Sequence, residues 1–557
     1  MNFRELLEEK KIIFFDGAMG TSLEPYLSPG ELPENLNLSS PEKVKNVHLS
    51  YVKAGADVIE TNTFGANRLK LERAGLDDKI KEVNFFGVKI AREAACNRLV
   101  GASVGPLGEL VRPWGNITGS QAFEIFKEQI EILAEAGADI IVIETMMSLK
   151  EAKIAAVAAS QVCDLPIVCQ LTFDERGKTL IGTGPQVAVL TLEAVKVDVI
   201  GANCSTGPDR MFPIARIMLS SSKLPLIFQP NAGKPYLEEG KTRFPMGPEE
   251  FSLWMRKFVQ SGARIVGGCC GTTPSHIQQM IEKIGKIEVS FPLRKDILKG
   301  LSSRTQNYYL DRKKPLLLGV NISAEDFKDQ NRLLEIIAKA EQAGCSFLNI
   351  TLRDINTDFN TELLINTLQQ NTALGITIDT ENPAILEEAL REFEGKPLVF
   401  LEKEDDNLLK IAEKWGADVG FNVHLDNKKS AAKNTREILE KCREKNFKNP
   451  MVRVIFSPFI KKDYAVKEDL EEIQKILKEY SFEMIFDLAN FSCKVPGGLY
   501  LTGFVLGVAS WMGVVGAILD PSQVNSSLIL RAAEALCYKD KEGKNFITSM
   551  GDKNEII

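Results

Sequence analysis

The sequence lacks the features of several protein classes. No apolar run approaches the roughly 20 residues that span a bilayer, so no membrane-spanning helix is expected. Positive charge is not in excess: 68 Lys and Arg stand against 75 Asp and Glu, and the net charge of −7 argues against a mainly electrostatic nucleic-acid binder. The first residues, MNFRELLEEKK, are charged and helical in pattern, unlike a signal peptide. We therefore expect neither a membrane nor a nucleic acid as a partner.

Paired Cys-x-x-Cys knuckles, which are typical of closed structural zinc sites, are also missing, although the chain has 10 cysteines. Their irregular spacing in a large chain predicts a reducing cytoplasm rather than a disulfide framework. Seven of them lie mostly in apolar or helical contexts, and we interpret these as packing residues: Cys96, Cys163, Cys169, Cys345, Cys442, Cys493 and Cys537. The other three are Cys204, Cys269 and Cys270.

One short pattern recurs: a helical stretch ends at a glycine and a short apolar run follows. It occurs at residues 54–57, 136–139, 261–264, 343–345 and 416–418. The glycine is typical of a helix cap, and the apolar run is typical of a buried strand. Alternating helices and near-continuous apolar strands predict a parallel sheet.

Polar residues follow nearly every predicted strand of the first half. They are Asp16, Glu60, Asn62, Glu144, Asn203, Cys204, Asn231, Cys269 and Cys270. In an eight-fold α/β barrel the active site is built at the carboxyl ends of the strands. A doubly wound open sheet would also gather ligands there, at its switch point. The spread over nearly every strand favours the barrel.

A basic, irregular stretch at residues 286–314 interrupts the alternation, and we interpret it as a linker. The flanking segments, residues 1–285 and 315–557, are each close to the roughly 250 residues of one barrel. The sequence therefore predicts an α/β fold of two tandem (β/α)8 TIM barrels.

The three remaining cysteines predict a metal site in the first barrel. Thiolates are soft ligands that select zinc among the common divalent ions. Three of them leave one tetrahedral position open, as a catalytic zinc requires. A zinc ion with three thiolates is a poor Lewis acid for making hydroxide, but it keeps a bound substrate thiolate nucleophilic, so the pattern favours thiol alkylation over hydrolysis. A disulfide between Cys269 and Cys270 is disfavoured because adjacent cysteines bridge only with strain.

Seven motifs of the first half resemble the homocysteine S-methyltransferase family. They are DGAMGT (16–21), ETNTF (60–64), VGP (104–106), ETM (144–146), NCS (203–205), PNAG (230–233) and GGCCGT (267–272). Their order and spacing are similar to the homocysteine-binding barrel of cobalamin-dependent methionine synthases, over nearly all of residues 1–285.

The resemblance implies an enzyme that methylates the thiol of homocysteine to give methionine. It implies Cys204, Cys269 and Cys270 as catalytic zinc ligands, with the homocysteine thiolate completing the tetrahedron and Asn231 near the metal when substrate is absent. Asp16 and Gly17 are expected to hold the amino-acid head group, and Glu144 is a candidate partner for its ammonium. Either carboxylate could instead cap the helix that follows it.

By position and length the second half resembles the pterin-binding barrel of methionine synthases, a relative of dihydropteroate synthase that binds methyltetrahydrofolate. Asn321, Asp379 and Asn490 remain from that family's cofactor-binding pattern. Other motif positions are replaced, among them Leu401-Glu402 and Ser457-Pro458. Each lost polar contact costs about 1–3 kcal/mol, so we expect this barrel to bind methyltetrahydrofolate poorly or not at all.

The cobalamin motif Asp-x-His-x-x-Gly does not occur in the sequence. A corrinoid donor would therefore be methylcobalamin on a separate corrinoid protein. Three alternatives stay open: a module that uses methyltetrahydrofolate, a methyltransferase with another thiol acceptor or with a betaine or sulfonium donor, and a non-catalytic scaffold role for the second barrel.

Overall fold

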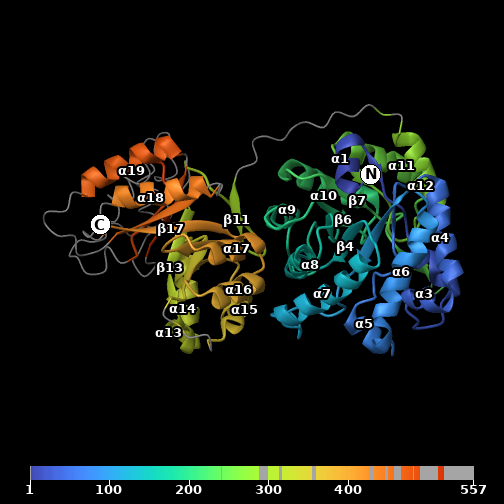
Figure 1. Ribbon diagram of the computed structural model, residues 1–557, viewed down its shortest axis with the longest axis horizontal. Helices are drawn as coiled ribbons and strands as arrows, with labels where there is room; N and C mark the ends of the chain where they lie inside the picture. The colour runs from blue at the N-terminus through green and yellow to red at the C-terminus, as the bar shows by residue number, and fades with distance from the viewer. Residues whose placement is uncertain are drawn as a thin grey trace, which may run out of the picture. The chain divides into compact units, whose positions relative to one another are not determined.

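Two compact units make up the chain, Met1–Ile297 and Leu298–Ile557, each with its own parallel sheet (Figure 1). The structure is a computed structural model, and it describes residues 2–239, 241–285, 287, 299–312, 316–353, 355, 359–425, 431–445, 450–456, 466–480, 482–489 and 512–519. Among these residues, no helix is both long enough and apolar enough to cross a membrane.

Eight parallel strands form the barrel of the first unit, in the order β1-β10-β7-β6-β5-β4-β3-β2. A parallel bridge between Phe15 and Val58 closes the ring between β1 and β2. The strands are β1 (Ile13–Phe14), β2 (Val58–Glu60), β3 (Leu99–Val104), β4 (Ile140–Met146), β5 (Ile167–Leu171), β6 (Val199–Asn203), β7 (Leu226–Gln229) and β10 (Ile265–Val266).

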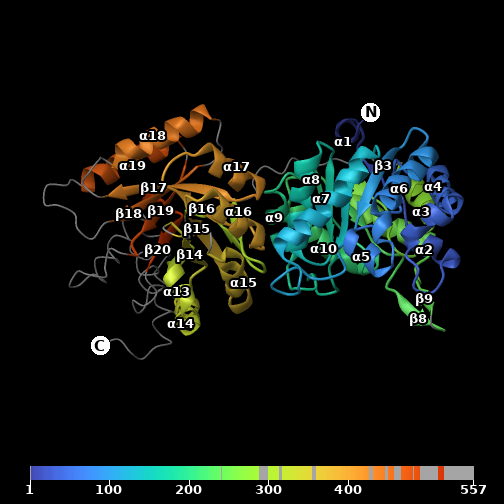
Figure 2. The same ribbon diagram turned by 60° about the horizontal axis from the view of Figure 1, so that its bottom comes forward.

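Helices surround this barrel, and an antiparallel hairpin of β8 (Tyr236–Glu238) and β9 (Lys241–Arg243) projects from it (Figure 2). The longer helices are α1 (Phe3–Glu9), α4 (Pro41–Ala54), α6 (Ile80–Ala95), α7 (Gly119–Glu135), α8 (Leu149–Val162), α9 (Pro185–Leu192), α10 (Pro208–Ser221), α11 (Pro248–Gln260) and α12 (Pro274–Ile284). Short helical turns are α2 (Gly20–Leu23), η1 (Glu24–Tyr26), η2 (Pro33–Asn35), α3 (Leu36–Ser39), α5 (Arg68–Arg73) and η3 (Asp77–Lys79).

The second unit is also a closed parallel barrel, with its eight strands in sequence order. They are β13 (Leu316–Ser323), β14 (Phe347–Thr351), β15 (Gly375–Asp379), β16 (Leu398–Leu401), β17 (Asp418–Leu425), β18 (Met451–Phe456), β19 (Glu483–Asp487) and β20 (Gly516–Ile518). Its helices are α13 (Ala324–Lys328), α14 (Gln330–Gln342), α15 (Thr361–Asn371), α16 (Pro383–Glu392), α17 (Asp406–Lys414), α18 (Ala431–Glu444) and α19 (Val466–Tyr480). The prediction of two tandem (β/α)8 barrels is confirmed.

The recurring glycine pattern explains how the sequence produces this alternation. Its five glycines follow α4, α7, α11, α14 and α17, and all have φ between 70° and 112°. That left-handed conformation ends a helix with little strain only at a residue without a Cβ. A buried strand follows each one: β2, β4, β10, β14 and β17.

An N-terminal segment of each unit packs into the apolar core of its barrel. In the first unit Phe3 and Leu6 of α1 join the buried strand residues, and the Phe3 ring lies 6.2 Å from that of Phe15. In the second unit a hairpin of β11 (Gly300–Ser302) and β12 (Asn307–Tyr309) does the same, with Leu301 buried in the core.

This hairpin lies inside the stretch that the sequence analysis interprets as a linker. Three-residue strands in a basic segment give no periodic signal, so only the packing against the barrel reveals them. The part of the linker segment that the structure describes from residue 299 to 312 therefore belongs to the second unit.

Candidate functional site

Three cysteine side chains converge at the carboxyl ends of β6 and β10. The Sγ atoms of Cys204, Cys269 and Cys270 all lie within 4.8 Å of one another. Zn–S bonds of about 2.3 Å place tetrahedral sulfur ligands about 3.8 Å apart. The donor set and its spacing therefore fit one zinc ion, although Cys204 is far in the sequence from the adjacent Cys269 and Cys270.

The backbone around the cysteines is held in sparsely populated conformations. Cys204 and Ser205 both have φ of 59°, and the N–H of Thr206 donates to the Cys204 carbonyl at 2.7 Å. Gly271 has φ of 78°, and a Cβ on it would lie 2.1 Å from Cγ of Phe244. Backbone strain of this kind persists where the surrounding structure fixes it, often at functional sites.

Hydrogen bonds within the cluster distribute the thiol protons unevenly. Hydrogen bonds from Cys269 and Cys270 lower the pKa of Cys204 well below its usual value. The hydrogen bond with Cys204 raises the pKa of Cys269, and it raises that of Cys270 to about 12. The buried Asn231 side chain also hydrogen-bonds Cys204 and lowers its pKa further. Asn231 therefore lies beside the thiols, and its place near a bound metal stays a prediction.

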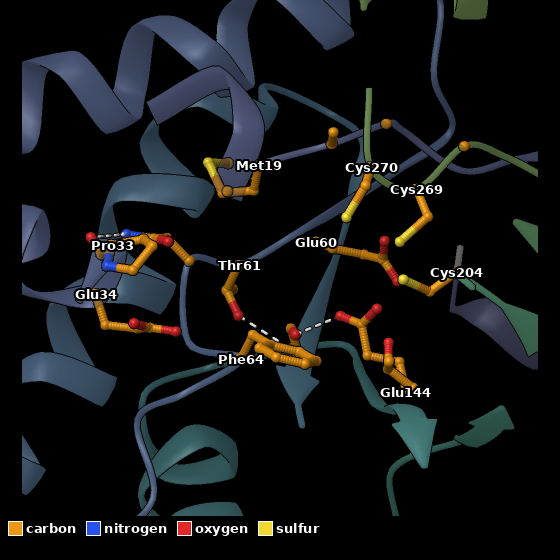
Figure 3. A pocket seen from close by; sticks show the side chains of 17 residues that line it. Met19, Pro33, Glu34, Glu60, Thr61, Phe64, Glu144, Cys204, Cys269 and Cys270 are labelled. Atoms are coloured by element: carbon orange, nitrogen blue, oxygen red, sulfur yellow. Dashed lines mark hydrogen bonds between the residues drawn. The ribbon is translucent and has the colours of Figure 1, made fainter. Parts of the chain in front are cut away.

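The cysteines form one wall of a cavity of about 300 Å³ (Figure 3). Its lining comes from β2, β3 and β4 near their carboxyl ends, from the loops after β1, β2, β6 and β10, and from α2 and η2. Met19, Pro33, Glu34 and Phe64 line the part away from the cysteines (Figure 3). The cavity is therefore lined by thiols at one end and by both polar and apolar side chains at the other.

Glu144 lines this cavity, and its carboxylate is held in place. The hydroxyl of Ser103 donates to it at 2.5 Å, and the amide of Asn203 donates to it at 2.9 Å. Burial raises the pKa of Glu144 to about 7. The predicted partner for a substrate ammonium is therefore in reach of a ligand in the cavity.

Gly17 also lines the cavity, whereas Asp16 is not among its lining residues. The Asp16 carboxylate is buried and accepts the backbone N–H of Glu60 at 3.0 Å. A Cβ on Gly17 would lie 2.6 Å from Oγ1 of Thr272, so glycine is required for the close approach of these loops. Of the expected head-group pair, only Gly17 faces the cavity.

Several lining residues were not singled out as site residues by the sequence analysis. Glu34 lies in the short helical turn η2 and Phe64 lies in the loop after β2, where no periodic pattern marks a residue as facing inward. Ser103 lies within β3, and its serine identity in an apolar run is the only signal that could have drawn attention to it. The sequence marks Glu60 only as a polar residue at the end of a strand.

Asp379, the residue retained from the pterin pattern, is part of an ion network in the second barrel. Nε of Arg353 lies 2.6 Å and Nη1 of Arg453 lies 2.7 Å from its carboxylate oxygens. Nε of Arg453 also donates to Asp487 at 2.9 Å, and Arg353 pairs with Glu402. Both Asp379 oxygens therefore already accept guanidinium hydrogen bonds.

The other two pterin-pattern residues are less fully described. Asn321 lies in β13, where its backbone pairs in register with Asn349. Asn490 lies outside the described residues.

Comparisons with known proteins agree with the first-unit geometry. Residues 13–284 match the family model for homocysteine S-methyltransferase. A methionine synthase of Mycobacterium tuberculosis is 26% identical over 478 residues, covering 78% of this chain, and one of Mycobacterium leprae is 31% identical over 304 residues, covering 51%. The chain spans only 40% and 25% of the lengths of these two relatives.

Among solved structures, the metallated form of the homocysteine methyltransferase MmuM from Escherichia coli is 25% identical, with a TM-score of 0.44. The match covers 50% of this chain and 99% of that protein. Over residues 13–284 of its first unit, the chain is therefore similar to the homocysteine S-methyltransferase family.

Proposed function

We propose that the first unit, residues 1–285 in the sequence-based division, transfers a methyl group to the thiol of homocysteine and forms methionine. One observation supports this most directly: three cysteine sulfurs lie within 4.8 Å of one another on the wall of a cavity that also contains fixed carboxylates. A cluster of soft ligands beside an anionic pocket suits an acceptor that has a thiol at one end and an ammonium group at the other.

Cys204, Cys269 and Cys270 are the residues that would hold a zinc ion. Bound zinc supplies one chemical effect, because it lowers the pKa of a coordinated thiol so that the sulfur is a thiolate near neutral pH. The protein's own groups orient the acceptor: Gly17 lets the backbone approach the head group, and Glu144 presents a carboxylate to it. The eight described cysteines are free thiols, in keeping with a reducing compartment such as the cytoplasm.

The methyl donor in this proposal is methylcobalamin carried by a separate corrinoid protein. Zinc-loaded protein incubated with L-homocysteine and free methylcobalamin is therefore expected to form methionine, measured by liquid chromatography with mass spectrometry. Parallel reactions with methyltetrahydrofolate, glycine betaine and a methylsulfonium compound test the other donors. Methionine formed from one of these donors and not from methylcobalamin would overturn the donor assignment while leaving the acceptor intact.

The second barrel is expected not to bind methyltetrahydrofolate with useful affinity. The carboxylate that would pair with the pterin ring, Asp379, already accepts hydrogen bonds from Arg353 and Arg453. A ligand would have to displace these guanidinium groups from a buried carboxylate, which is costly because buried charges need partners. This internal pairing also favours a structural role for the second barrel.

Calorimetric titration of the full chain with methyltetrahydrofolate should show no heat of binding in the micromolar range. The titration should be repeated after homocysteine addition, so that binding at the first unit is recognised separately. A micromolar dissociation constant that Asp379→Asn weakens would show that the second barrel does bind the folate.

A further inference from the structure

A second cavity lies on the surface of the first unit, between the helices α5 and α7. The two helices lie side by side in both views of the chain (Figures 1 and 2). This cavity, the α5–α7 groove, has a volume of about 520 Å³, within the roughly 300–1,000 Å³ that is usual for small-molecule sites. None of its lining residues lines the cavity that contains the cysteines. Its walls include Arg68, Leu69, Ile117, Glu124, Ile125 and Glu128.

Apolar side chains form part of the α5–α7 groove. Leu69 comes from α5, Ile125 comes from α7, and Ile117 lies just before α7. Each of these three side chains stays partly exposed. Apolar side chains that gather in a hollow of the surface bury their exposed area when a ligand covers them. The groove therefore suits a ligand with an apolar body.

The charged side chains of the groove are mainly acidic. Arg68 is the one cation among its lining residues, and its Nε already donates to Glu128 at 2.9 Å. Glu124 lies one helical turn before Glu128 on the same face of α7. It is exposed, and it has no ion pair within the part of the chain that the structure describes. The groove therefore keeps one carboxylate for the positive charge of a ligand.

Both helices of the groove also contact the loop after β2, which lines the cavity of the cysteines. Nζ of Lys70, in α5, lies 4.7 Å from the centre of the Phe64 ring. Nε2 of Gln129, in α7, donates to the carbonyl of Thr63 at 2.9 Å. Phe64 is one of the side chains that line the cavity of the cysteines (Figure 3). A ligand that changes the spacing of α5 and α7 would therefore act on this loop.

We propose that the α5–α7 groove is a second ligand site, which binds an amphipathic organic cation. The ammonium group of the ligand pairs with Glu124, and its apolar chain covers the three apolar side chains of the groove. Charge complementarity selects this class of ligand, because an anion would face the carboxylates of Glu124 and Glu128. The inference goes beyond the proposed function and does not depend on it, because it concerns a different cavity.

The test compares three five-carbon probes that differ only in their end group: n-pentylammonium, 1-pentanol and pentanoate. Dissociation constants of the probes for the full chain are measured by calorimetry. n-Pentylammonium should bind about 3- to 10-fold more tightly than 1-pentanol, because an ion pair at a partly exposed site contributes less than a buried one. Pentanoate should bind most weakly. Glu124→Gln should remove the preference for the cation and leave the binding of 1-pentanol unchanged.

Glu131→Gln is the matched control, because Glu131 is an exposed glutamate of α7 that does not line the groove. This variant should keep the preference for n-pentylammonium. Saturating n-pentylammonium should also slow hydrogen exchange in peptides that cover residues 61–73 and 117–128. Equal binding of the three probes, a preference that Glu124→Gln retains, or protection confined to the cysteine loops would overturn the inference. Methionine formation by a protein without this preference would reject the inference and keep the proposed function.

Discussion

Cys269→Ser is expected to remove stoichiometric zinc from the protein and to abolish methionine formation. The hydroxyl of serine is a hard, protonated ligand at neutral pH, whereas the site depends on soft thiolates. Removing a residue that only hydrogen-bonds a metal ligand already costs about 10- to 100-fold in metal affinity or activity. Losing one of only three protein ligands should therefore cost more than 100-fold.

Metal content is measured by inductively coupled plasma mass spectrometry after dialysis against a weak chelator, and activity is measured by methionine formation. Cys96→Ser is the matched control because Cys96 is exposed and is not part of the sulfur cluster. It should retain one zinc per chain and full activity. Full zinc occupancy in Cys269→Ser would contradict the assignment of the site.

Arg453→Met is expected to destabilise the second unit by about 3–5 kcal/mol, the cost of breaking a buried ion pair from one side. The guanidinium group is almost fully buried and donates to both Asp379 and Asp487. Methionine fills a similar volume, so the loss reflects charge rather than a cavity. Asp487 would lose this guanidinium partner, whereas Asp379 would keep Arg353.

The loss of stability is measured by hydrogen exchange of the full chain in urea. Peptides that cover β15 and β18 report the stability of the second unit, so the unit need not be isolated. Arg436→Met is the matched control, because Arg436 pairs with Glu472 and Glu479 on the surface. Such exposed pairs contribute about 0–1 kcal/mol. Arg453→Lys should give a stability loss between those of the two methionine variants. Lysine keeps the positive charge but lacks the planar guanidinium group. Equal stability of Arg453→Met and Arg436→Met would refute the role of the network.

The fold was predictable because its repeating unit is local. An amphipathic helix, its glycine cap and the following apolar strand are neighbours in the sequence. The regular repetition of this unit is enough to indicate a parallel barrel. The hairpin at residues 300–309 was not predictable in this way. Its strands are too short to show a period, and they are stabilised by packing against Leu318 and Phe347 of another part of the second unit.

The candidate metal ligands were predictable from residue type, because three thiols that follow buried strands in glycine-rich segments are typical of a metal site. The acid groups were harder to assign. Asp16 and Glu60 both follow strands, and nothing in their local sequence says which one faces the cavity. That choice depends on the loop of Thr272 and on the side chain of Gln229, which come from distant segments.

The sequence by itself was enough to predict the two barrels and the three candidate cysteine ligands. The barrels follow from local patterns of secondary structure, and the cysteines follow from the ligand chemistry of the thiol group. Only the tertiary structure decided which carboxylates face the cavity and which face each other. It also decided that Asp379 is paired with arginines rather than available to a ligand. These outcomes depend on contacts between strands far apart in sequence, where a shift of a few ångströms changes the partner of a charged group.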